Sequence, residues 1–261
     1  MLVLLSPSKN LDFKTKVATR KRSEPMFLDQ AQALIGELRQ LDAKRISKLM
    51  NISGELGELN AERYAQWQLN PIGGRPAALA FRGDVYLGLG AREFSERDLT
   101  SAQRRLRILS GLYGVLRPLD LIHPYRLEMG TALKMNGSSD LYDFWSSTIT
   151  DQLNSELKDG SNPILVNCAS SEYFPEANQR RINYPVVNCR FLQKHRDDYR
   201  FMSYFGKRAR GLMARHLVLS RASTRKEIKA FDLEGYYFSP DRSTKNDLVF
   251  LRDERPQPNS R

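Results

Sequence analysis

The sequence has few of the residues that most often mark metal or thiol chemistry. Among 261 residues it contains two cysteines, Cys168 and Cys189, and three histidines, His123, His195 and His216. CxxC and HExxH patterns are absent, and the histidines are scattered along the chain. A zinc or iron site built from thiolate and imidazole ligands is therefore not expected, and we predict no metal and no cofactor. Both cysteines lie in apolar, strand-like runs, which predicts two small buried thiols and no disulfide.

Long apolar runs are missing as well. None approaches the roughly 20 residues that a membrane span needs, so we expect no membrane partner. The apolar run at residues 2–5 is too short for a signal peptide and no basic segment precedes it, which makes the cytoplasm the expected location. Glycine loops of the Walker and dinucleotide-binding types are absent, and so is the nucleophile elbow Gly-x-Ser-x-Gly. These absences disfavour standard NTPases, Rossmann dehydrogenases and serine hydrolases.

Carboxylates are outnumbered by cationic side chains. Lys and Arg total 41 against 30 Asp and Glu, for a formal net charge of +11. Such an excess favours an anionic partner, such as nucleic acid, a nucleotide or acidic lipid, although a solvated basic surface is the alternative. The excess is concentrated between Arg190 and Lys229, where Tyr199, Tyr204 and Phe205 interleave with the cations. Basic side chains beside aromatic rings are typical of a nucleic-acid groove, which makes DNA the expected partner.

Strand-like and helix-like segments interleave without a regular alternation. Periodicity and end signals predict helices over residues 28–41, 44–50, 61–67, 95–107, 140–157 and 207–220, with Ser95 as an N-cap. Short apolar runs predict strands over residues 2–5, 77–81, 164–168, 186–192, 201–205, 236–238 and 248–251. No linker or repeat interrupts the pattern, so the expected fold class is α/β: a single mixed α/β domain with an irregular central sheet. It covers residues 1–255, and the polar tail 256–261 is expected to be disordered.

Several short segments place charged residues beside glycine at the ends of apolar runs. Loops after buried strands are where α/β proteins place ligand sites. The cations that these segments offer to DNA phosphates or to a smaller anion are Lys9, Arg82, Arg117, Arg126, Lys207, Arg208 and Arg210. The carboxylates that are candidates for acid or base catalysis are Asp84, Glu128 and Glu172. Internal ion pairs that fix loops explain the same pattern equally well.

Residues 46–64 suggest a helix, a glycine-containing hairpin and a second helix. The order is similar to the helix-hairpin-helix motif, in which hairpin glycines and the next helix offer backbone N–H groups to DNA phosphates. Here Gly54 and Gly57 are the candidate glycines, but they stand one residue further apart than in the usual motif. Glu55 and Glu58 also place negative charge where a phosphate should lie. Two packed core helices with a glycine turn are the alternative.

Long motifs spread over nearly the whole chain resemble the YaaA family of bacterial peroxide-stress proteins. The segments that carry the resemblance are 4–11 (LLSPSKNL), 81–89 (FRGDVYLGL), 109–120 (LSGLYGVLRPLD), 124–130 (PYRLEMG), 167–174 (NCASSEYF) and 207–213 (KRARGLM). Ser8 and Cys168 are small departures from the residues familiar at these positions.

The resemblance implies a cytoplasmic protein induced by hydrogen peroxide that limits damage from unincorporated iron. It also implies a mixed α/β fold with a basic cleft, a helix-hairpin-helix element and DNA binding. It assigns no catalyst, so whether the protein is an enzyme stays open, as does its oligomeric state. Two hypotheses follow: a protein that binds DNA without strong sequence specificity, or an enzyme or sensor for a small anionic, nucleotide-like ligand held in the charged cleft.

Overall fold

A largely parallel sheet forms the centre of the molecule. The computed structural model describes residues 1–70, 73–135 and 137–253, and the sheet has eight strands. Its five central strands run parallel in the order β12, β9, β8, β1 and β5. Their bounds are Leu2–Leu5 (β1), Leu106–Ser110 (β5), Leu165–Asn167 (β8), Val186–His195 (β9) and Asp247–Arg252 (β12). β1 and β8 are buried along their whole length, because neighbouring segments cover both of their faces.

Antiparallel strands complete the edges of this sheet. The strands β6 (Gly114–Leu116), β10 (Asp198–Arg200) and β11 (Tyr237–Phe238) pair with β5, β9 and β12 respectively. Two small antiparallel ladders lie outside the sheet. They pair β2 (Asn10–Leu11) with β4 (Phe81–Arg82), and β3 (Arg75–Pro76) with β7 (Leu121–Ile122). The fold is therefore the single mixed α/β domain that the sequence predicts.

The order of strands reverses beside β1. From β1 the chain passes to β5 on one side, and it later places β8, β9 and β12 in succession on the other side. The connections that follow β1 and β8 thus leave in opposite directions. In open parallel sheets a crevice forms outside the carboxyl ends of two such strands, and ligands bind there.

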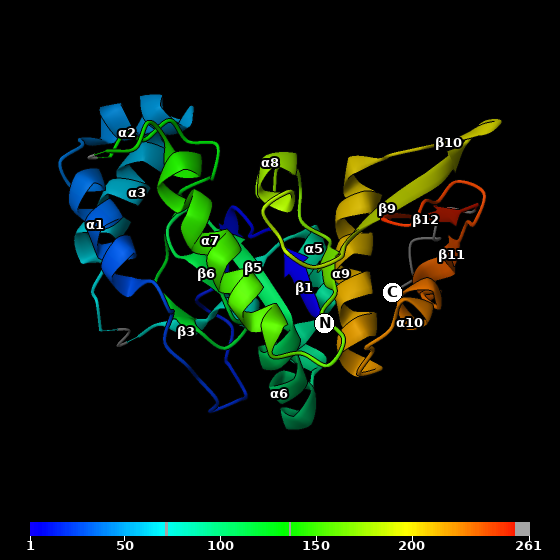
Figure 1. Ribbon diagram of the computed structural model, residues 1–261. Coiled ribbons are helices and arrows are strands. Elements are labelled where there is room, and N and C mark those ends of the chain that lie inside the picture. The colour runs from blue at the N-terminus through cyan, green and yellow to red at the C-terminus, as the bar shows by residue number, and fades with distance from the viewer. Residues whose placement is uncertain (71–72, 136, 254–261) are drawn as a thin grey trace.

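Ten α-helices are found in the described residues. They are α1 (Leu28–Leu38), α2 (Ala43–Met50), α3 (Gly54–Gln66), α4 (Ala77–Ala80), α5 (Asp84–Leu89), α6 (Glu96–Arg105), α7 (Leu141–Lys158), α8 (Glu176–Gln179), α9 (Ser203–Leu219) and α10 (Arg225–Lys229). Short 3₁₀ turns cover Ala91–Glu93 and Leu233–Gly235. The helices α1 to α3 gather at one end of the molecule, whereas α10, β11 and the protruding β9–β10 hairpin lie at the other (Figure 1). Over the described ranges, no helix combines the length and apolar character that crossing a membrane requires.

Most predicted elements are confirmed, including the start of α6. Ser95 Oγ accepts from the Asp98 N–H, and the Asp98 carboxylate accepts from the Ser95 N–H, which completes a capping box. Cys168 and Cys189 are buried free thiols, as expected. The predicted tail 256–261 lies outside the described residues.

Two predicted strands are wrong. The run at 77–81 begins with the helix α4, because the N–H groups of Ala77 and Ala78 donate to the carbonyls of Asp120 and Pro118. Alanine has the highest helix propensity, so the apolar run misled the prediction. The aromatic run at 201–205 instead leads into α9, which begins at Ser203.

Candidate functional site

The floor of the candidate site is formed where the loops after β1 and β8 meet. Ser6 follows β1, and Ser170 lies three residues beyond β8. The Ser170 N–H donates to Ser6 Oγ at 2.8 Å, and the two hydroxyl oxygens are 3.2 Å apart. The Tyr86 hydroxyl donates to the Ser6 carbonyl at 3.0 Å and joins α5 to the same loop. This floor lies at the switch point of the sheet, where the fold predicts a crevice.

A close helix contact brings a second wall to this floor. The helices α5 and α9 touch at Gly88 and Gly211, and a β-carbon at either position would overlap a backbone carbonyl of the other helix. Only glycine permits so close an approach of two backbones. As a result Asp84, at the start of α5, and Lys207 and Arg210, near the start of α9, line the same cavity.

The segment 124–130 lies beside the cleft without lining it. Gly111 lets this segment approach the end of β5, because a β-carbon there would overlap the Leu127 carbonyl. The Glu128 carboxylate lies 2.7 Å from Lys9 Nζ and 2.8 Å from Arg126 Nη2. The segment is further fixed by the buried Tyr64, whose hydroxyl donates to the Arg126 carbonyl. A chain of ion pairs therefore joins this segment to the loop after β1.

The loops after β1 and β8, together with the starts of α5 and α9, line a cleft of about 330 Å³. It is lined by Ser6, Pro7, Ser8, Lys9, Asn10, Gly83, Asp84, Val85, Tyr86, Ser170, Glu172, Tyr173, Lys207 and Arg210. The volume falls within the range of small-molecule sites, roughly 300–1,000 Å³. Five predicted site residues line the cleft, and Arg126 and Glu128 adjoin it through Lys9. Of the residues expected to converge on one cleft, Lys9, Asp84 and Glu172 line it.

Two carboxylates at the cleft have pKa values displaced in opposite directions. Burial raises the pKa of Glu172, and the neighbouring Glu128 charge raises it further, against the opposing effects of Lys9 and the Gly130 N–H. Burial would also raise the pKa of Glu128, but hydrogen bonds from Lys9 and Arg126 outweigh it and lower the pKa. Neighbouring groups with divergent pKa values suit proton donation by one and charge stabilisation by the other.

Arg210 is the most unusual charge in the cleft. Its guanidinium lies over the Phe201 ring, 5.8 Å from the ring centroid, but it has no ion pair or hydrogen bond to any residue that the structure describes. Burial lowers the pKa of Arg210, because the charged form loses hydration in the cleft. A partly buried cation without a carboxylate is unfavourable unless an anion approaches it. Lys207 lines the same cleft and has no ion pair within the described chain.

Three candidate cations, Arg82, Arg117 and Arg208, do not line this cleft. The exposed Arg82 side chain lines a different cavity, beside Asp12 and Glu93. Arg117 binds the fully buried Asp120 carboxylate, with its Nε and Nη2 both 3.0 Å from Oδ1. Arg208 forms a bidentate pair with Glu234, with Nε 2.8 Å from Oε1. For Arg117 and Arg208, the alternative of internal ion pairs is confirmed.

The two candidate hairpin glycines do not form a turn. Gly54 and Gly57 both belong to α3, which Ser53 caps, and the turn between α2 and α3 is made by residues 51–53. Asn51 adopts the left-handed conformation that ends α2. Gly57 is buried against α2, and a β-carbon at this position would overlap the Ser47 side chain. The glycine hairpin expected at 54–57 is therefore wrong, and Gly57 serves helix packing.

The basic run from Arg190 to Lys229 is not one solvated face. Of the 17 residues of α9 within it, eight are buried, and several cations of the run pair with carboxylates from other segments. Arg215 pairs with Glu93 at 2.8 Å, and Arg221 pairs with Asp98 at 2.7 Å. These carboxylates are far from the cations in the sequence but close to them in the fold. The run therefore has fewer unpaired cations than its composition suggests.

Sequence reasoning did not single out the hydroxyl groups of the floor. Ser6, Ser170 and Tyr86 stood within the quoted motifs, but only charged residues were chosen as candidates. The signal that could have found the two serines is their position directly after buried strands, since parallel strands end at one edge. The adjacency of β1 and β8, however, depends on pairing across more than 160 residues.

The fold and the cleft define a mixed α/β protein with a charged cavity at the switch point of its sheet. The chain belongs to the family described as peroxide stress protein YaaA, which it matches over residues 1–242. Membership in a family of peroxide stress proteins is consistent with a role in the oxidative stress response. The match covers every element that lines the cleft.

Proposed function

We propose that the cleft binds a small ligand through a phosphate or similar anionic group. The observation that carries this proposal is Arg210, a partly buried guanidinium with no anionic partner in the described chain, beside Lys207 and Lys9. Arginine binds phosphate through two parallel hydrogen bonds, and lysine supplies a mobile point charge. The volume of about 330 Å³ suits a ligand of nucleotide size better than a duplex.

The proposed ligand would also meet a proton donor or acceptor. Glu172 lines the cleft with a raised pKa, while the ion pairs of Glu128 keep that carboxyl charged. If the cleft carries out chemistry, Glu172 is the group suited to general acid or base catalysis. Asp84, the third candidate, lines the opposite wall on α5.

The test is protection against thermal unfolding by inorganic phosphate and by nucleoside monophosphates. A ligand that binds the folded state alone raises the midpoint as its concentration exceeds Kd. Arg210→Gln should weaken binding roughly 10- to 100-fold, since a hydrogen bond to a charged group contributes about 1.5–3 kcal/mol. Arg208→Gln is the matched control, because it removes the same charge two residues away but from the Glu234 pair. Equal protection of both variants would refute the assignment of Arg210.

A second function, DNA binding in the cytoplasm without strong sequence specificity, is favoured by the net charge of +11. By this function we propose that the protein limits iron-dependent oxidative damage at the DNA. The described residues contain no group of three or more His, Cys, Asp or Glu suited to hold a metal ion. This composition favours protection of the target over iron storage. The free thiols Cys168 and Cys189 suit a reducing compartment.

The DNA-binding proposal predicts a steep dependence on salt. The logarithm of the binding constant should fall linearly with the logarithm of salt concentration, with similar values for unrelated duplexes. Competition by inorganic phosphate at the cleft separates the two functions, because occupation of a small cavity should leave a separate DNA surface free. Salt-insensitive binding, or none at low salt, would contradict this function.

A further inference from the structure

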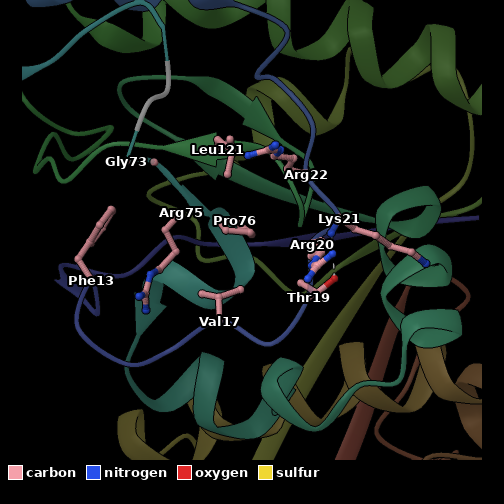
Figure 2. Close-up of a pocket in the computed structure, with 11 residues that line it drawn as sticks. Phe13, Val17, Thr19, Arg20, Lys21, Arg22, Gly73, Arg75, Pro76 and Leu121 are labelled. Carbon is pink, nitrogen blue, oxygen red and sulfur yellow. Dashed lines mark hydrogen bonds between the residues drawn. The ribbon is translucent and has the colours of Figure 1, made fainter.

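A second cavity, separate from the cleft, is lined by cations and has no carboxylate among its lining residues. It has a volume of about 410 Å³ and lies between the segment 13–22 and the β3–β7 ladder (Figure 2). The lining residues are Phe13, Val17, Thr19, Arg20, Lys21, Arg22, Gly73, Gly74, Arg75, Pro76 and Leu121. None of the sequence motifs assigned to the cleft contributes to it. We call residues 12–23 the strap and this cavity the basic groove.

The first end of the strap is held by Asp12. Its carboxylate accepts hydrogen bonds from the N–H groups of Lys14 and Thr15, each at 2.9 Å, and from the Thr15 hydroxyl at 2.7 Å. The Asp12 N–H donates to the Ala80 carbonyl at 2.7 Å. Arg92 Nη2 adds an ion pair to the same carboxylate at 2.8 Å. This end of the strap is therefore fixed to α4 and to the 3₁₀ turn at Ala91–Glu93.

The second end is held by Ser23. Its N–H donates to the Leu119 carbonyl at 2.9 Å, and its carbonyl accepts from the Leu121 N–H at 2.8 Å. The Ser23 hydroxyl donates to the buried Asp120 carboxylate at 2.6 Å. Ser23 thus forms a parallel bridge with Asp120, directly beside β7. Both ends of the strap are anchored in the core.

Between these anchors, the Lys21 ammonium group is bound by α6. It donates at 2.6 Å both to the Glu96 carbonyl and to the Thr100 hydroxyl of α6. Figure 2 shows the Lys21 side chain extending toward α6, whereas Arg22 lies beside Leu121. Along residues 17–24 less exposed and exposed residues alternate, and Arg20 and Arg22 are the exposed neighbours of Lys21.

Arg20 and Arg22 consequently offer free positive charge to the groove. Both side chains are exposed, and neither has a hydrogen bond or ion pair to a residue within the described chain. Arg75 adds a third guanidinium, only partly neutralised by Asp12 at 3.5 Å and placed over the Phe13 ring at 5.7 Å. An anchored strap restricts the two free arginines before any ligand arrives, which lowers the entropy cost of binding.

We propose that the basic groove binds the sugar-phosphate backbone of DNA. Arg20 and Arg22 both line the groove and carry guanidinium groups without a partner in the described chain, so they suit contacts with DNA phosphates. Such contacts read no base. The inference rests on the second function proposed above and assigns a surface to it, distinct from the cleft.

The experiment measures binding of the full-length protein to a labelled short duplex by fluorescence anisotropy, between roughly 50 and 200 mM salt. The double variant R20Q/R22Q should bind more weakly at every salt concentration. Its slope against the logarithm of salt should be smaller by about 2, one for each lost phosphate contact. Because both side chains are exposed, the thermal midpoint should not change.

The matched control is R190Q/K194Q, which removes the same charge from two exposed side chains on β9, in the basic run. We expect the slope and affinity of this control to stay close to those of the wild type. An equal loss in both variants would show that binding follows overall charge; it would overturn the assignment of the groove and leave DNA binding standing. Absence of binding by the wild type at low salt would overturn both.

Discussion

Arg117 and Arg210 both stand in glycine-containing, largely apolar segments, yet their surroundings differ in one respect. The Arg117 guanidinium meets a fully buried carboxylate, and its Nη2 also donates to the Glu24 carbonyl at 2.8 Å. Arg210 has an aromatic ring beside it, but no acceptor among the described residues. The first arginine satisfies a charge that the fold has buried, whereas the second leaves its own charge unsatisfied.

A charge that stabilises the fold and a charge that is available to a ligand differ in one property. Both side chains are arginines, and both segments contain glycine. What differs is whether the protein supplies the counter-charge itself. Within the segment 109–130 the protein supplies the counter-charge twice, with Asp120 for Arg117 and Glu128 for Arg126.

The largest loss of stability is expected when the buried Arg117–Asp120 pair is broken. Arg117→Ala leaves the Asp120 carboxylate buried without a cation, and this should lower the free energy of unfolding by roughly 3 kcal/mol. Urea denaturation monitored by tryptophan fluorescence measures the change. Phosphate protection of the remaining folded protein should be unaltered. A variant as stable as the wild type would remove the distinction between the two arginines.

A somewhat smaller loss is expected from the helix contact that builds the cleft. Gly211→Ala forces a β-carbon against the Val85 carbonyl of α5, and overpacking of this kind costs about 1–3 kcal/mol. Because α5 and α9 must separate, phosphate protection should fall as well. The control is Gly36→Ala in α1, where no atom lies within 4 Å of the new β-carbon. It should stabilise the protein by roughly 0.5–1 kcal/mol, and a loss of stability there would undermine the argument from packing.

Removal of the unsatisfied cation should have little effect on stability. Arg210→Met replaces a partly buried charge with an apolar side chain of similar length, and it should leave the free energy of unfolding unchanged or raise it by about 1 kcal/mol. Phosphate protection should be lost at the same time. Calorimetry with and without phosphate gives both quantities. A strong destabilisation would mean that Arg210, like Arg117, serves the scaffold.

The smallest effect concerns an exposed pair. Hydrogen bonds from Ser95 and Arg221 lower the pKa of Asp98 from 3.8 to about 2. A carboxyl with a lowered folded-state pKa stabilises the protein above its unfolded pKa and loses that contribution as pH falls toward the folded value. The stability advantage of the wild type over Asp98→Asn should therefore shrink between pH 3.8 and about 2.

Urea midpoints across this pH range test the prediction for Asp98. Asp29→Asn is the control, because Asp29 lies in the first turn of α1 and has no side-chain hydrogen bond within the described residues. Its difference from the wild type should vary less with pH. A constant gap for Asp98→Asn would show that its ion pair with Arg221 contributes nothing in the folded state.

Local signals predicted much of the fold. The Ser95 cap, the buried run at 2–5 and the strands around Val166 and Val187 were all visible as short-range patterns, because capping and short apolar runs depend on neighbours in sequence. The errors at 77–81 and 201–205 have a different cause. There the apolar composition suits helix and strand alike, and contacts with distant segments decide between them.

The sequence predicted the residue types of the candidate site, but it did not predict which individual residues lie there. Lys9, Asp84, Glu172, Lys207 and Arg210, all singled out from the sequence, line one cleft in the structure. Arg82, Arg117 and Arg208 show the same local pattern and lie elsewhere. The counter-charges that neutralise Arg208 and Arg215 come from Glu234 and Glu93, which no local rule could pair with them.

The sequence by itself determined the class of fold, the burial of both thiols, the excess of positive charge and the family. These properties follow from composition, short-range periodicity and motif order, which do not depend on how distant segments pair. The tertiary structure decided which cations remain free. Neutralisation of a charge requires a partner within a few ångströms, and only the packing of α5 on α9, of β1 beside β8 and of the strap over β7 sets those distances.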